Sequence, residues 1–219
     1  MRLRTVSTLV GSLVIGGLAS TLALQAASPV PRPSKEFTII LPSGQQKLLS
    51  SYRGKVVMMA CMFTTCPHCQ ALSKIITKLQ GELGPRGFQA VGVAFNDEVN
   101  TTNPATNAKV TSNFISEFGV GFTMGYAPRP SVMSYLGLSD IERWVVPQVA
   151  IIDRKGVVRA QSAAGGTADL QTETYLRKYL GELLDEGGAK SAAPAKTPPK
   201  NIISVSRKTH IPKVPESFC

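Results

Sequence analysis

Histidine and cysteine are scarce in this chain, whose 219 residues include two His and four Cys. Two of the cysteines form a close pair, so a zinc site would have to draw its other ligands from Cys61, Cys219, His68 and His210. His68 lies between the paired cysteines and His210 near the C-terminal end, so a closed tetrahedral site would require the chain to loop back. We therefore predict that the protein holds no metal and needs no cofactor.

Acidic residues are also few, 14 against 24 Lys and Arg, which gives a net charge of +10. A basic face of this strength on a folded domain would be typical of a nucleic-acid-binding protein. The excess lies almost entirely in residues 1–35 and 187–219, and residues 36–186 carry a net charge of only +1. This distribution predicts no nucleic-acid partner.

Charged residues are missing altogether from Thr5–Ala27, a stretch that follows Arg2 and Arg4. Basic residues before an uncharged run that ends in small residues are typical of an export signal. As a helix the run would span roughly 30 Å, which is enough to cross a bilayer. We predict that residues 1–27 are a signal peptide or an uncleaved anchor that tethers the protein to the membrane. Both alternatives place the body outside the cytoplasm, in a periplasm or in the medium.

Composition divides the rest of the chain into three parts. Residues 28–36 are rich in proline and are predicted to be a linker. Residues 37–186 have the apolar content of one ordinary domain, which we expect to be monomeric. Residues 187–219 are basic and rich in Pro, Ala and Lys, and they offer too few apolar groups to offset the entropy of ordering. They are predicted to be a disordered tail.

Apolar runs and turn residues predict the order of elements in residues 37–186. The uninterrupted apolar run Val56–Phe63 favours a central strand buried on both faces. A helix that ends near Leu83 and a second apolar strand at Phe88–Phe95 follow, which indicates a right-handed parallel crossover. The other predicted elements are strands at 37–41, 47–49, 119–126, 145–152 and 157–160, a loop at 96–107, and helices at 110–118, 132–136 and 169–184.

The sequence Cys66-Pro67-His68-Cys69 stands where the first apolar strand gives way to a helix. A helix start leaves amide hydrogens unpaired, and these stabilise a thiolate at Cys66, the form that attacks disulfides. Cys69 lies one helical turn further on, close enough to close a ring with Cys66. A purely structural disulfide would gain little from so short a loop. We therefore predict a redox-active disulfide with Cys66 as nucleophile and Cys69 as the buried resolving cysteine.

Residues 36–185 resemble the thioredoxin superfamily and, within it, the extracytoplasmic TlpA/ResA-like redoxins. The residues that carry the resemblance are Arg53-Gly54-Lys55-Val56-Val57, Cys66-Pro67-His68-Cys69, Val146-Pro147 and Ile152-Asp153-Arg154-Lys155-Gly156. The resemblance implies an α/β, thioredoxin-like fold, with a central mixed sheet flanked by helices on both faces. It also implies that Pro147 is cis and lies against the disulfide, which would explain a proline inside a predicted strand. Val146 and Pro147 are thus expected to bind the partner chain.

Several residues depart from the patterns of these relatives. Leu72 stands where many cytochrome-maturation members carry an acid, and Ala60 stands where thioredoxin has its buried acid. The pair Pro67-His68 resembles that of the periplasmic disulfide oxidants, whose thiolate is unusually stable. Cys61 is interpreted most simply as a small buried apolar residue, with a role as a third redox cysteine as the alternative.

The resulting hypothesis is an extracytoplasmic thiol–disulfide oxidoreductase with Cys66, Pro67, His68, Cys69 and Pro147 as its catalytic residues. Its expected partners are protein thiols or disulfides and a redox partner protein. The alternative from another class is a copper carrier on a redoxin fold. Such carriers space their cysteines by three residues and add a distal His, whereas the body has no His other than His68. A peroxidase is less favoured, because the Pro-x-x-x-Thr-x-x-Cys pattern of peroxiredoxins is absent before Cys66.

Overall fold

The computed structural model describes residues 28–188. The predicted signal peptide or anchor at 1–27 lies outside the described residues, as do residues 189–219 of the predicted 187–219 tail. The first two residues of that predicted tail, Gly187 and Gly188, instead end the last helix. Among residues 28–188, no helix combines the length and the apolar character that crossing a bilayer requires.

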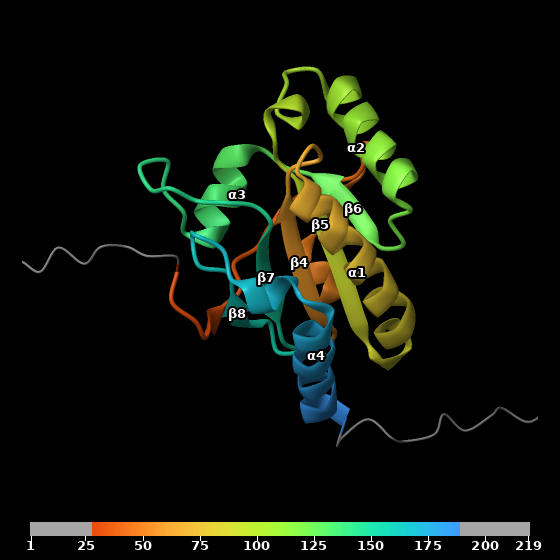
Figure 1. The fold of residues 1–219 in the computed structure, drawn as a ribbon, viewed down its shortest axis with the longest axis vertical. Helices are drawn as coiled ribbons and strands as arrows, with labels where there is room; N and C mark the ends of the chain where they lie inside the picture. The colour runs from red at the N-terminus through yellow and green to blue at the C-terminus, as the bar shows by residue number, and fades with distance from the viewer. Residues whose placement is uncertain (1–27, 189–219) are drawn as a thin grey trace, which may run out of the picture.

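The described chain forms one mixed sheet with helices on both of its faces (Figure 1). The strands are β1 Arg32–Pro33, β2 Thr38–Ile40, β3 Gln46–Leu48, β4 Val56–Met62, β5 Phe88–Ala94, β6 Thr123–Tyr126, β7 Gln148–Ile152 and β8 Val157–Gln161. The helices are α1 Pro67–Leu83, α2 Pro104–Phe118, α3 Arg129–Leu136 and α4 Glu173–Gly188. The sheet order is β1-β8-β7-β4-β5-β6-β2-β3, which agrees with the predicted α/β, thioredoxin-like fold.

Strand β4 lies at the centre of the sheet, as its apolar run predicts. Its residues are all buried, and it pairs parallel with β5 and antiparallel with β7. Successive side chains of β4 enter opposite cores because a strand alternates its faces. Met58 and Ala60 pack in the core under α1, α2 and α4, whereas Met59 and Cys61 pack in the core under α3.

Helix α2 begins at Pro104, six residues before the predicted start, so the end of the predicted 96–107 loop is helical. The side chain of Asn103 accepts a hydrogen bond from the Ala105 amide at 2.9 Å, which caps the helix. Pro104 occupies the first helical position, where its missing N–H costs nothing. The first turn of α2 is polar, so apolar periodicity could not predict that the helix begins there.

Part of the predicted 28–36 linker belongs to the sheet. Arg32–Pro33 forms β1 and pairs antiparallel with β8. The Arg32 guanidinium donates to the Gln161 side chain at 2.6 Å and to the Tyr135 carbonyl at 3.0 Å. A two-residue strand at the edge of a sheet leaves no periodic signal in the sequence. The linker was predicted from proline content alone, and this prediction was wrong for Arg32–Pro33.

Candidate active site

The cysteine motif lies at the junction of β4 and α1. Cys66 is the N-cap residue of α1 with extended backbone angles, and Pro67 occupies the first turn. The Cys66 carbonyl accepts from the Gln70 amide at 3.1 Å, and the Cys66 amide donates to the Phe63 carbonyl at 3.2 Å. Cys66 therefore stands at the N-terminus of α1, and such a helix start stabilises negative charge.

The two cysteines of the motif differ in their access to solvent. Cys66 is partly exposed, and Cys69 is fully buried in the core under α1. Burial raises the pKa of the Cys69 thiol, and the neighbouring Cys66 raises that pKa further. Cys69 is therefore held as a neutral thiol, while Cys66 is the sulfur that a partner can reach.

The start of β7 lies against the nucleophile position. The Cys66 Sγ atom is 3.9 Å from the Val146 carbonyl oxygen, and the Val146–Pro147 peptide is cis, as the family resemblance implied. Pro147 directly precedes β7 and thus takes no place in the ladder. The structure brings Cys66 and the Val146 carbonyl together, with Pro147 next in the chain, and it leaves Pro67 and His68 exposed on the first turn of α1.

Apolar side chains fill the positions at which related proteins carry acids. Leu72 and Ala60 are buried, and both belong to the same core cluster as Cys69. Neither Leu72 nor Ala60 has a carboxyl group that could take a proton from Cys69. Across residues 28–188, no group of three or more His, Cys, Asp or Glu side chains is arranged to hold a metal ion.

Cys61 packs on the other face of β4 from Cys69. Its side chain belongs to the core under α3, whereas Cys69 belongs to the core under α1. Burial raises the pKa of the Cys61 thiol to about 12. The sheet separates the two sulfurs, which favours the interpretation of Cys61 as a small buried apolar residue.

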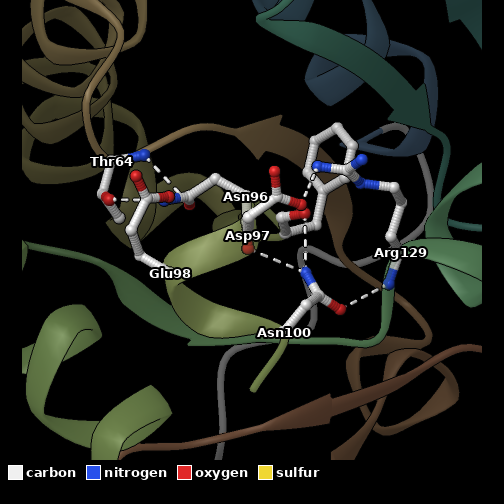
Figure 2. A network of polar contacts seen from close by, with 7 residues as sticks. Thr64, Asn96, Asp97, Glu98, Asn100 and Arg129 are labelled. Carbon is white, nitrogen blue, oxygen red and sulfur yellow. Dashed lines mark hydrogen bonds and ion pairs between the residues drawn. The ribbon is translucent and has the colours of Figure 1, made fainter.

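A polar network that was not predicted from the sequence lies beside the motif, as Figure 2 shows. Asn96 lies two residues after the end of β5 and forms two hydrogen bonds with Thr64, two residues before Cys66. One signal was available, since the carboxyl ends of the parallel strands β4 and β5 meet at one edge of the sheet. The first polar residue after β5 therefore had to lie near the loop that precedes Cys66.

Solved structures with a similar fold include two thiol:disulfide interchange proteins. One, a thioredoxin family protein from Chlorobium tepidum TLS, is 22% identical with a TM-score of 0.56, covering 72% of this chain and 99% of that chain. The other, from Bacteroides sp., is 16% identical with a TM-score of 0.55, covering 74% of this chain and 92% of that chain. At these identities the likeness establishes the fold.

Curated relatives match a shorter stretch. "Probable glutathione peroxidase 8-A" from Xenopus laevis is 30% identical over 81 residues, which is 37% of this chain and 38% of the relative. The chain thus matches well under half of that relative's length. A family model described as Redoxin matches residues 25–178, a span that includes the whole sheet and the cysteine motif. The chain therefore belongs to the redoxin family.

Proposed function

We propose that this redoxin is a thiol–disulfide oxidoreductase that exchanges electrons with protein disulfides and dithiols through Cys66 and Cys69. The observation that carries the proposal is the asymmetry of the pair. Cys66 is a partly exposed thiol at the start of α1, and Cys69 is a buried thiol of raised pKa one turn later. One accessible nucleophile and one protected resolving thiol are what two-step disulfide exchange requires.

The reaction proceeds through a mixed disulfide. The Cys66 thiolate attacks one sulfur of the partner disulfide, and the partner's other sulfur leaves as a thiolate that takes a proton from water. Cys69 then loses its proton and attacks the Cys66 sulfur, which breaks the mixed disulfide and releases the second partner thiol. The protein dithiol becomes a disulfide and the partner disulfide becomes a dithiol, so two electrons and two protons pass to the partner. The same steps in reverse oxidise a partner.

The loop before β7 supplies the partner-binding surface. The Val146 carbonyl lies next to the Cys66 sulfur, and Pro147 is the next residue of this loop. Ile141 and Val145 in the same loop expose 96% and 39% of their surface. Large exposed apolar side chains on the loop that reaches the nucleophile suit a protein partner better than a small solute. Val146 and Pro147 are thus assigned to partner binding.

The N-terminal sequence supports an extracytoplasmic location for this chemistry. Arg2 and Arg4 before an uncharged run are the pattern of an exported protein. Oxidising compartments permit a disulfide to persist, whereas cytosolic thiols are kept reduced. The proposed partners are protein thiols or disulfides in that compartment, together with a second redox protein that resets the Cys66–Cys69 pair.

Alkylation of the reduced protein tests the assignment of the two roles. Iodoacetamide near neutral pH should label Cys66 at least about tenfold faster than Cys69, because only Cys66 is accessible and Cys69 stays protonated. Peptide mapping after timed quenching measures both rates in one sample, and buried Cys61 serves as the internal reference for an inert thiol. Equal labelling of Cys66 and Cys69, or faster labelling of Cys69, would remove the assignment.

His68 is proposed to make the couple more oxidising than that of thioredoxin. A histidine in the spacer adds a hydrogen-bond donor beside the Cys66 sulfur and thus favours the reduced form. In a glutathione redox buffer, His68→Pro should lower the reduction potential by about 30 mV or more, a tenfold change in the equilibrium constant. The variant His68→Gln keeps a hydrogen-bond donor and the helical backbone, so its reduction potential should lie between those of the wild type and His68→Pro. A potential unchanged within about 10 mV in both variants would contradict the role of His68.

A further inference from the structure

Asn96 is a buried polar residue whose side chain pairs with the backbone and side chain of Thr64. The Thr64 amide donates to Asn96 Oδ1 at 3.2 Å, and Asn96 Nδ2 donates to Thr64 Oγ1 at 2.9 Å (Figure 2). Asn96 exposes 2% of its surface and Thr64 exposes 8%. Loss of this pair would leave buried polar groups without partners, so the two residues hold each other in one arrangement.

Thr64 is fixed from a second direction as well. The side chain of Gln70, on the first turns of α1, donates to the Thr64 carbonyl at 3.2 Å. The amide, hydroxyl and carbonyl of Thr64 are therefore all engaged. Cys66 follows two residues later and donates its own amide to the Phe63 carbonyl at 3.2 Å. The short loop from Phe63 to Cys66 thus takes its position from Thr64.

Asn96 rests on a turn that is anchored to helix α3. Asn100 Nδ2 donates to the Asn96 carbonyl at 2.9 Å and to the Phe95 carbonyl at 2.7 Å. Asn100 Oδ1 accepts from the Arg129 amide at the start of α3 at 2.8 Å, and the Arg129 guanidinium pairs with Asp97 at 2.6 Å. Asn96 Nδ2 also donates to Glu98. Figure 2 shows this chain of contacts from Thr64 to Arg129.

We propose that Asn96 is a positioning residue for the redox reaction, and that it holds the Phe63–Cys66 loop so that the Cys66 sulfur stays beside the Val146 carbonyl. This inference rests on the proposed function. In the disulfide form a covalent bond to Cys69 fixes Cys66, whereas in the dithiol form its position depends on hydrogen bonds, to which the Phe63–Cys66 loop contributes. Asn96 therefore stabilises the dithiol form more than the disulfide form, and its loss makes the couple more reducing.

The test compares redox equilibrium and Cys66 reactivity in matched variants of the full chain. Asn96→Ala should shift the equilibrium with glutathione about tenfold toward the protein disulfide, or about 30 mV, and slow Cys66 alkylation severalfold. Thr64→Val removes the hydroxyl acceptor and should shift both values in the same direction, whereas Thr64→Ser keeps the hydroxyl and should retain wild-type values. The double variant Asn96→Ala/Thr64→Val should match Asn96→Ala alone, because the two residues act through one contact.

Asn107 provides the control for lost stability. It too is buried, at 7% exposure, and its side chain bonds the Thr101 hydroxyl at 2.7 Å and carbonyl at 3.0 Å. Asn107→Ala should lower the unfolding midpoint and leave the potential unchanged. The inference would be overturned if Asn107→Ala shifted the reduction potential as much as Asn96→Ala does. It would also be overturned if Asn96→Ala and Thr64→Val both had the wild-type potential. If Asn96→Ala does not fold, the comparison of reduction potentials between Thr64→Val and Thr64→Ser tests the inference instead. Absence of exchange in the wild type would instead overturn the proposed function itself.

Discussion

Replacement of Cys66 by serine is expected to abolish disulfide exchange, with a loss of about a thousandfold or more in rate. A serine hydroxyl stays protonated near neutral pH, so it supplies no anion to attack a sulfur. Cys69 cannot substitute for the lost nucleophile, because it is fully buried and its pKa is raised. The loss should be seen as the absence of reduced glutathione when the reduced variant is mixed with oxidised glutathione.

Replacement of Cys69 by serine should have a different outcome. Cys66 keeps its place at the start of α1 and still attacks, but nothing resolves the mixed disulfide. Mass spectrometry should therefore find one glutathione on Cys69→Ser and none on Cys66→Ser. Both variants carry Cys219→Ser so that the C-terminal thiol adds no adduct. Cys61→Ala, on the other face of β4, is the matched control and should exchange as the wild type does. A glutathione adduct on Cys66→Ser would contradict the assigned roles.

The resolving step is expected to accelerate with pH, by about a hundredfold between pH 7 and pH 9. Burial raises the pKa of the Cys69 thiol, so at neutral pH almost all of it is protonated and the attacking fraction grows about tenfold per pH unit. Leu72 and Ala60 occupy the places where relatives carry an acid, and they can take no proton from Cys69. We therefore expect water to accept the proton.

The measurement isolates resolution from attack. Cys66 is first loaded with one equivalent of a chromogenic thiol as a mixed disulfide at low pH, and release of that thiol is then followed after a jump to each higher pH. Cys69→Ser, loaded in the same way, gives the background of intermolecular loss. A rate that stays flat from pH 6 to pH 9 would show that a group other than water takes the Cys69 proton.

Local patterns in the sequence predicted the elements that carry the site. The apolar runs of β4 and β5 and the helical pattern of α1 were sufficient, because a strand buried on both faces and an amphipathic helix leave periodic signals. The family resemblance added the cis peptide before Pro147. Alternation along β4 implied that neighbouring residues face opposite cores, but nothing local indicated which core holds Cys61.

Contacts between distant segments were beyond such reasoning. Asn96 and Thr64 are 32 positions apart, and their pairing depends on the side-by-side ends of β4 and β5. The two-residue strand β1 depends on the Arg32 side chain reaching Gln161 and Tyr135. Single hydrogen bonds of this kind have no period. The parallel crossover placed the end of β5 near the loop before Cys66, but it did not show which side chains pair.

The measurement that tests the central claim most directly is a redox titration of the wild-type chain in glutathione buffers, with acid quenching, alkylation and peptide mapping at each potential. Cys66 and Cys69 should pass together from two thiols to one intramolecular disulfide in a single two-electron transition. We expect its midpoint to lie above about −270 mV, the potential of thioredoxin. A Cys66 that only accumulates a glutathione adduct, or a pair that stays reduced in every buffer, would contradict the account.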